Sequence, residues 1–319
     1  MRAKAAGWRW GRLLTEARNP RSGGLDRMPT ARIVRLLLEE DRRALSAALA
    51  AAPAITRAAE EAARALREGG RVVFLGAGTS GRLGVLEAAE CPPTFGSDPD
   101  RIVGVMAGGE GAVFRAVEGA EDRADDGAAR AGGLGPRDLL VGVSASSVTP
   151  FVRGALAAAR AQGARTVLVT CAPGRGLAAL ADVVVVARTG PEVLTGSTRL
   201  KAGSATKAVL NAITTAAMVR LGKAYENFMV DLRPGSAKLR DRMGRIVAAA
   251  TGLGARRAEA LLQAAGGEVK AAIVMGRLGV AAPEARERLR AAGGHVRAAL
   301  AGAPARAPRR RPPSRARTR

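Results

Sequence analysis

Two short segments combine backbone freedom with hydroxyl groups, and each follows a run of apolar residues. GAGTSGRLG (76–84) has glycines that permit tight turns, and a helix starting there would offer free N–H groups to an anion. VSASSVTP (143–150) places four hydroxyls before Pro150, a residue that favours the first turn of a helix. Both segments could therefore hold a phosphate group without a metal ion.

Each segment also has a purely structural interpretation. GAGTSG could be an ordinary turn, because no acidic residue closes a second strand about 20 residues later, as in a dinucleotide fingerprint. One hydroxyl is enough to cap a helix, whereas the second segment carries four in six residues, which favours ligand binding there. The candidate phosphate-binding residues are Gly78, Thr79, Ser80, Ser144, Ser146 and Thr149.

Acid–base chemistry falls to carboxylates, lysine, tyrosine or the substrate itself, because the sequence holds a single histidine, His295. That count excludes histidine-rich metal sites and argues against a histidine-based triad. Glu90 precedes Cys91-Pro92-Pro93, and we expect it at a helix end near the carboxyl edge of a sheet. Glutamates on helices are usually solvated, so residue type alone leaves their roles open. The other carboxylates in unusual contexts are Glu118, Glu121, Asp122 and Glu192.

Short apolar, β-branched runs alternate with helical or glycine-rich connections. This alternation predicts an α/β fold with an open, doubly wound parallel sheet of five strands flanked by helices. In such sheets, ligands bind beyond the carboxyl ends of the strands. The expected strands are RVVFL (71–75), IVGVM (102–106), DLLVGV (138–143), TVLVT (166–170) and DVVVVA (182–187).

Helical patterns surround these runs. Residues 31–67 predict two helices separated at Pro53, and a long helix is expected over 197–221. Short helical patterns split by glycines follow Pro234-Gly235 and predict a small helical subdomain. The expected organisation is a basic extension (1–12), a main domain (13–236), the helical subdomain (237–301) and a disordered Arg/Pro-rich tail (302–319).

The net charge of +23 would suggest a nucleic-acid partner, but its distribution argues against one. Residues 1–12 hold four basic groups and 302–319 hold seven, with no acidic group in either segment, which leaves +12 on the body. We therefore expect no nucleic-acid partner. No charge-free apolar run reaches the roughly 18 residues that span a bilayer, so we expect no membrane partner either. Two cysteines outside any metal-ligand pair, without a secretory signal, predict a cytoplasmic protein.

Six strings together resemble the N-acetylmuramic acid 6-phosphate etherases over roughly residues 13–300. Two of them, ECPPTFG and GSTRLKAG, are too long and unusual for chance agreement in order. The resemblance implies the sugar-isomerase (SIS) fold and a C-terminal bundle similar to a ubiquitin-associated domain. The strings are LLTEARNP (13–20), FLGAGTSGRLGVLEAAECPPTFG (74–96), AVEGAED (116–122), GPEVLTGSTRLKAGSATKAVLN (190–211), GKAYENFMVDL (222–232) and the pattern ATG…EA…VKAAIVM (250–275).

The family's reaction, in peptidoglycan recycling, converts N-acetylmuramic acid 6-phosphate and water into N-acetylglucosamine 6-phosphate and D-lactate. The resemblance assigns the acid to Glu90 and the base to Glu121. Once the sugar opens to its aldehyde, one carboxylate can remove the C2 proton while a protonated carboxyl gives a proton to the lactyl oxygen leaving C3. Water then adds across the double bond. An acid working near neutral pH needs a pKa raised from about 4.3. No metal or other cofactor is required.

The resemblance also implies a homodimer in which residues of one subunit complete the other's site and the 197–221 helix forms contacts. One departure is that the family usually reads AASGRTP where this chain has SASSVTP. Ser147 and Val148 thus replace glycine and arginine, and the lost arginine is expected to weaken binding of an anionic group. Further substrate-binding candidates are Glu192, Ser197, Thr198, Lys201 and Lys207.

Two other functions fit the same fold. A non-catalytic sugar-phosphate sensor, like the related glucokinase regulatory protein, is the main alternative. The presence of both Glu90 and Glu121 favours an enzyme, because a sensor needs no proton-transfer pair. A sugar-phosphate isomerase would share the fold but would not explain ECPPTFG.

Overall fold

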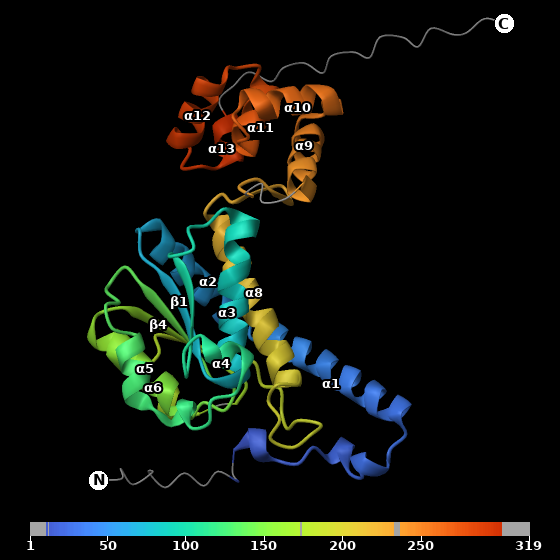
Figure 1. The fold of residues 1–319 in the computed structure, drawn as a ribbon, viewed down its shortest axis with the longest axis vertical. Coiled ribbons are helices and arrows are strands. Elements are labelled where there is room, and N and C mark those ends of the chain that lie inside the picture. The colour runs from blue at the N-terminus through green and yellow to red at the C-terminus, as the bar shows by residue number, and fades with distance from the viewer. Residues whose placement is uncertain (1–10, 12, 173, 233–236, 302–319) are drawn as a thin grey trace, which may run out of the picture. The chain divides into compact units, whose positions relative to one another are not determined.

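The protein forms two compact units, residues 1–221 and 222–319, in a computed structural model that describes residues 11, 13–172, 174–232 and 237–301 (Figure 1). The expected tail, 302–319, and all of the expected N-terminal extension except Gly11 lie outside the described residues. Within the described part of the chain, no helix has both the length and the apolar character needed to cross a membrane.

The first unit is built on a parallel sheet with strand order β2-β1-β3-β4-β5. In its register, Val72 of β1 is paired with Ile102 of β2 on one side and Leu139 of β3 on the other. The five expected strands are thereby confirmed, each to within one residue at either end. Their bounds are β1 (Val72–Gly76), β2 (Ile102–Met106), β3 (Leu139–Val143), β4 (Arg165–Thr170) and β5 (Val183–Val186).

Helices cover both faces of this sheet, as the doubly wound pattern predicts (Figure 1). Alternate strand residues point to opposite faces, so Phe74 packs in one apolar core and Leu75 in the other. The core around Phe74 is closed by α1, α2, α3 and α8, and the core around Leu75 mainly by α6. The bounds are α1 (Thr30–Ala50), α2 (Ala52–Arg67), α3 (Gly78–Phe95), α5 (Ala124–Arg130), α6 (Pro150–Ala161) and α8 (Lys201–Arg220).

Shorter elements complete the first unit. Among the described residues, three 3₁₀ helices precede α1, and one, η5, follows β2. The helix expected over 197–221 begins only at Lys201, because the Glu192 carboxylate accepts the N–H groups of Lys201 (3.2 Å) and Ala202 (2.9 Å) and fixes the start of α8 there. The short elements are η2 (Leu14–Glu16), η3 (Pro20–Ser22), η4 (Leu25–Arg27), α4 (Gly111–Phe114), η5 (Ala120–Asp122) and α7 (Arg175–Ala178).

The second unit combines a small β-hairpin with helices around its own apolar core. The hairpin leaves no pattern in the sequence, because two residues per strand are too few to alternate visibly. Asp231 forms ion pairs with Lys270 (2.6 Å) and Lys223 (2.9 Å), and the pair with Lys270 ties the segment after the hairpin to α11. The elements are β6 (Ala224–Tyr225), β7 (Phe228–Met229), α9 (Ala237–Thr251), α10 (Ala255–Ala264), α11 (Val269–Leu278), α12 (Ala282–Ala291) and α13 (Val296–Leu300).

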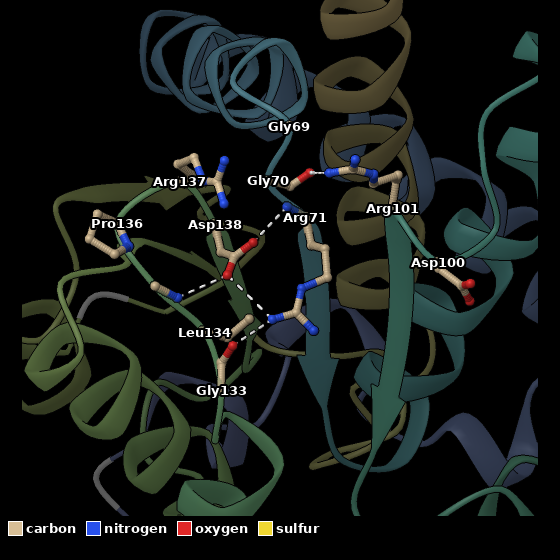
Figure 2. Close-up of a pocket in the computed structure, with 11 residues that line it drawn as sticks. Gly69, Gly70, Arg71, Asp100, Arg101, Gly133, Leu134, Pro136, Arg137 and Asp138 are labelled. Atoms are coloured by element: carbon tan, nitrogen blue, oxygen red, sulfur yellow. Dashed lines mark hydrogen bonds and ion pairs between the residues drawn. The ribbon is translucent and has the colours of Figure 1, made fainter.

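Asp138 lies at the amino edge of the sheet, where it connects the segments before β1 and β3 and lines a pocket of about 530 Å³ (Figure 2). Its carboxylate accepts the backbone N–H groups of Arg71 (2.7 Å) and Gly135 (2.8 Å) and also contacts the Arg71 guanidinium group at 3.3 Å. Burial alone would raise the pKa of the Asp138 carboxyl, but these hydrogen bonds lower it below its usual value. The charge on Asp138 therefore stabilises the starts of β1 and β3.

Asp138→Ala is expected to lower the free energy of unfolding by about 2 kcal/mol, because it leaves the N–H groups of Arg71 and Gly135 without their acceptor. A carboxyl with a lowered folded-state pKa stabilises the fold above its unfolded value of about 3.9 and loses that effect as the pH falls through the folded value. The difference from wild type should thus be full at pH 7 and shrink below about pH 4. Urea titrations at several pH values measure it. Asp100→Ala, an exposed carboxylate on the same hollow, is the control and should change stability by less than about 0.5 kcal/mol.

Candidate active site

The candidate active site lies at the carboxyl edge of the sheet, where the connections after β1 and β3 diverge. β1 pairs with both β2 and β3, the chain leaves β1 for α3 on one face, and it leaves β3 for α6 on the other. Parallel sheets bind ligands in the crevice at such a switch point. The two hydroxyl-bearing segments singled out in the sequence are therefore neighbours at this edge, as expected.

The β1–α3 connection brings the start of a helix close to the end of a strand. A Cβ on Gly81 would lie 2.5 Å from the Gly76 carbonyl oxygen, so this approach requires glycine. Gly78, Thr79 and Ser80 form the first turn of α3, whose N-cap, Ala77, supplies no side-chain acceptor. The first N–H groups of α3 thus have no partner within the helix and suit an anion.

The β3–α6 connection uses some of its hydroxyls internally and leaves others accessible. The Ser144 and Thr149 hydroxyls lie 2.8 Å apart, and the buried Ser147 hydroxyl donates to Thr170 Oγ1 at 2.9 Å. Ser147 has φ +62°, a left-handed conformation that favours glycine, which agrees with the glycine of the family pattern. Val148 is buried. Ser146 and Thr149 remain half-buried and can face a ligand.

The segment after β2 places Glu121 beside the β1–α3 connection. Glu118 and Glu121 line a small pocket of about 110 Å³ together with Gly78 and Arg82. The Arg82 guanidinium group donates to the carbonyl oxygens of Ala112 and Val113, each at 2.8 Å, and so holds this segment against α3. Both glutamates are exposed, so they can reach a ligand bound at the carboxyl edge.

The segment before α8 contributes differently from the sequence-based expectation. Glu192 is buried, and both of its carboxylate oxygens accept hydrogen bonds from the amides that begin α8. Burial raises the pKa of the Glu192 carboxyl. Lys201 is also buried, and its Nζ lies 2.5 Å from Glu40 Oε2. Ser197 and Thr198 are half-buried near the same edge. The side chains of Glu192 and Lys201 therefore fix the start of α8 and its contact with α1. Their expected contacts with the substrate stay predictions.

Glu40 of α1 is a buried anion that the sequence analysis missed. Besides Lys201, it accepts hydrogen bonds from Asn19 (3.0 Å) and Arg21 (2.7 Å). Asn19 also donates to the Pro191 carbonyl oxygen at 3.0 Å, which explains why LLTEARNP accompanies GPEVLTG among the matching strings. Burial alone would raise the pKa of Glu40, but its cationic and amide partners lower it. A single acidic residue on a long helix is usually solvated, so the sequence does not indicate that Glu40 is a buried ion-pair partner.

The expectation that Glu90 lies near the carboxyl edge is wrong. α3 runs antiparallel to the strands: Gly81 packs against Gly76 at the end of β1, whereas Gly84 packs against Phe74 in its middle. Glu90 lies twelve residues after Gly78, about 18 Å along the helix axis, and therefore toward the amino edge. The helix does not end at Pro92-Pro93 but continues to Phe95.

Glu90 borders a second pocket, of about 370 Å³, between α3 and α8. Lys207, another expected substrate-binding residue, lies there and donates to Asn211 Oδ1 at 3.3 Å. Glu90 and Lys207 are both exposed. The candidate residues thus form two groups on one chain, a carboxyl-edge group around Gly78, Ser146 and Glu121 and a flank group around Glu90 and Lys207.

Comparisons with known proteins identify the family. A model described as the glucokinase regulatory protein N-terminal SIS domain matches residues 54–160. An N-acetylmuramic acid 6-phosphate etherase of Rubrobacter xylanophilus is 53% identical over 268 residues, which cover 83% of this chain and 89% of that protein. One of Gloeobacter violaceus is 52% identical over 265 residues, covering 82% and 87%.

A solved structure of phosphoheptose isomerase from Neisseria gonorrhoeae is similar with a TM-score of 0.42 and 19% identity, covering 59% of this chain and 95% of that one. The identity to the two bacterial etherases extends over more than four fifths of the chain, far beyond the SIS match. It confirms the resemblance drawn from the matching strings. This chain belongs to the N-acetylmuramic acid 6-phosphate etherase family.

Proposed function

We propose that this protein cleaves the D-lactyl ether of N-acetylmuramic acid 6-phosphate by elimination and hydration, as a carbon–oxygen lyase. The observation that carries the proposal is the 52–53% identity to etherases over most of both chains. The carboxyl-edge group adds chemical support, because the free amides at the start of α3 lie beside a pocket that Gly78 and the Glu121 carboxylate both line. The match to a regulatory protein covers only 54–160 and favours no second function.

The proposed roles follow from where each group lies. The first turn of α3, with Gly78, Thr79 and Ser80, and the accessible hydroxyls of the β3–α6 connection hold the 6-phosphate at the switch point. Glu121 removes the C2 proton of the opened sugar, since it reaches the same pocket as Gly78. Glu90 protonates the lactyl oxygen that leaves C3.

A second copy of the chain must supply this acid. Glu121 shares a pocket with Gly78, whereas Glu90 lies about 18 Å from Gly78 along α3. Two groups so far apart cannot act on neighbouring carbons of one sugar. In a homodimer with twofold symmetry, the flank of one subunit can meet the carboxyl edge of the other, which brings each Glu90 to the partner's Glu121.

The first unit offers an apolar surface for such a dimer. Leu38, Leu45 and Leu49 of α1 are 61%, 55% and 76% exposed. Beside them, α1, α2 and α8 border a groove of about 650 Å³ lined mainly by leucine, isoleucine and alanine. Exposed apolar surface of this extent marks an interaction site. We propose that a second copy covers it, so that α8 contributes to the contact as the sequence suggests.

Incubation with N-acetylmuramic acid 6-phosphate, followed by assays of D-lactate and N-acetylglucosamine 6-phosphate, tests the function directly. The expected result is equimolar release of both products. Tight binding of the sugar phosphate without any lactate would instead identify a sensor. We also place the protein in the cytoplasm, because Cys91 and Cys171 are both free thiols.

Ser146→Ala is expected to raise KM for N-acetylmuramic acid 6-phosphate by about tenfold with little change in kcat, which corresponds to one hydrogen bond to a charged group. The phosphate is remote from C2 and C3, so its contacts contribute equally to the ground state and the transition state. Steady-state kinetics measure the two constants. Ser147→Ala is the matched control, because its hydroxyl is directed at Thr170, and its KM should stay within twofold of wild type. An unchanged KM for Ser146→Ala would place the phosphate elsewhere.

A further inference from the structure

The meeting of Glu90 with the partner's Glu121 restricts where the twofold axis of a dimer can run. In any twofold dimer, the midpoint between an atom and its copy in the partner lies on the axis. If the copy of Glu121 lies beside Glu90, the axis must pass close to the midpoint between Glu90 and Glu121 of a single chain. The residues near that midpoint therefore meet their own copies.

Leu86 of α3 lies near this midpoint. Glu121 shares a pocket with Arg82, and Arg82, Leu86 and Glu90 follow one another at intervals of four residues, so they lie along one side of α3. At a rise of about 1.5 Å per residue, Leu86 is about 6 Å along the helix axis from each of the other two. Leu86 thus stands halfway between the carboxyl-edge group and the flank group.

The surface around Leu86 is apolar and exposed. The Leu86 side chain is 44% exposed at the rim of the pocket of about 370 Å³ that Glu90 borders, the flank pocket. Phe114 and Val117, on the segment that leads to Glu121, are 88% and 48% exposed. Removing large apolar side chains such as these from water would stabilise a complex.

Helix α8 makes this surface continuous with the apolar groove that we assign to the dimer contact. Three of its exposed residues line the flank pocket, and the residues one position further along line the groove. The two hollows adjoin across one helix, so a single partner can cover both. The residues are Lys207, Asn211 and Thr215 on the flank side and Ala208, Ala212 and Ala216 on the groove side.

The charges on the two parts of this surface are complementary. The flank pocket contains two carboxylates, Glu87 and Glu90, and one ammonium group, Lys207. The segment between β2 and Glu121 carries the exposed cation Arg115 and the exposed anion Glu118. When this segment of one chain meets the flank pocket of another, each charged group has a partner of opposite sign within the same contact, which favours this pairing of surfaces.

We propose that Leu86 lies on the twofold axis of a homodimer and packs against its own copy, while Phe114 of each chain covers the flank pocket of the other. This placement rests on the proposed function, which requires Glu90 and the partner's Glu121 at one centre. The contact is self-complementary, because each chain contributes the same two parts and Leu86 lies between them. The apolar side chains of Leu86 and Phe114 then shield both centres from water.

Leu86→Cys tests the axis directly, because a cysteine on a twofold axis can form a disulfide with its own copy when the two Cα atoms are roughly 4.4–6.8 Å apart. Diamide accepts the two electrons and two protons of the paired thiols. After this treatment, most of the variant should migrate as a covalent dimer on a non-reducing gel. Ala157→Cys, exposed on α6 on the opposite face of the sheet, is the matched control and should remain a single chain.

The two native cysteines should not interfere with this test. Cys91 and Cys171 are both buried, and burial raises the pKa of their thiols to about 12 and about 11. Thiols that stay protonated and buried react slowly with oxidants. Wild-type protein treated with diamide measures whatever background they give.

Leu86→Glu should weaken the dimer, because it places two like charges opposite each other on the axis. The dissociation constant of the dimer, measured by sedimentation, should rise about a hundredfold or more. Lactate release per chain should be low in dilute solution and recover as the protein concentration rises, a dependence that a misfolded variant does not show. Ala157→Glu should leave both measurements unchanged.

The outcomes separate the axis from the reaction. Cross-linking of Leu86→Cys no greater than that of Ala157→Cys, or a dissociation constant of Leu86→Glu close to that of wild type, overturns the placement of the axis. Absence of lactate release from wild type overturns the proposed function, and a Leu86→Cys cross-link would then still support the contact between the two copies.

Discussion

Glu90→Gln and Glu121→Gln should each lower kcat for lactate release by about a hundredfold or more, since proton transfer by a positioned side chain contributes roughly 10²–10⁴ in rate. Glutamine keeps the size and part of the hydrogen bonding, so the dissociation constant for a sugar phosphate should change little. Single-turnover kinetics with N-acetylmuramic acid 6-phosphate measure the chemical step, and calorimetry with N-acetylglucosamine 6-phosphate measures binding. Deuterium incorporation at C2 in D₂O separates the roles, because it depends on the residue that moves the C2 proton, which we assign to Glu121.

A hybrid dimer with one subunit of each variant should regain activity that neither variant has alone. If each site takes Glu121 from one chain and Glu90 from the other, one of the two sites in the hybrid has both glutamates intact. The purified hybrid, selected with two different affinity tags, should therefore work at about half the wild-type rate. An inactive hybrid, given two folded and inactive parents, would mean that both glutamates serve the same site from one chain. Near-normal lactate release by Glu121→Gln would remove Glu121 from the mechanism and make Glu118, which lines the same pocket, the next base to test.

Glu40→Gln should lower the free energy of unfolding of the first unit by about 3–5 kcal/mol, because it leaves the buried Lys201 ammonium without its counter-charge. Thermal and urea denaturation measure the loss, with a decrease in Tm of roughly 10 °C for a unit of this size. The folded-state pKa of Glu40 is lowered, so the stabilisation is present above the unfolded value of about 4.3 and is lost as the pH falls below it.

Two comparisons isolate the buried pair. Glu39→Gln removes the neighbouring carboxylate, which pairs with Arg21 at the surface, and should cost less than about 1 kcal/mol. The double variant Glu40→Met/Lys201→Met removes both charges and should recover most of the lost stability. If Lys201→Met raised KM strongly without loss of stability, Lys201 would act on the substrate rather than on Glu40.

The sheet could be predicted from the sequence because its strands are short, β-branched and buried on both faces, a pattern that local residue types report directly. The carboxyl-edge group followed from the sheet, since the topology of a parallel sheet fixes where the connections after β1 and β3 lie. Glu121 took its role from the matching strings, and the structure adds its pocket with Gly78 and Arg82.

The sequence could not place features that depend on contacts between distant segments. Proline usually ends a helix, but α3 passes through Pro92 and Pro93. The position of Glu90 was misjudged for a different reason, because a helix that leaves β1 at the carboxyl edge returns antiparallel to the strands and carries its far end toward the amino edge. The start of α8 depends on Glu192, nine residues earlier, and the burial of Glu40 depends on Lys201, 161 residues later.

The course of α3 gives one rigid element a part in both catalytic centres of the proposed dimer. Its first turn belongs to the phosphate cradle of its own subunit, and its Glu90 end belongs to the partner's centre. In the proposed dimer, any displacement of α3 by phosphate at one centre would reach the acid of the other centre along the helix axis. Because linkage is reciprocal, the proposed arrangement predicts that the two centres influence each other, and we expect the rate to depend on sugar-phosphate concentration along a cooperative rather than a hyperbolic curve, which steady-state kinetics measure.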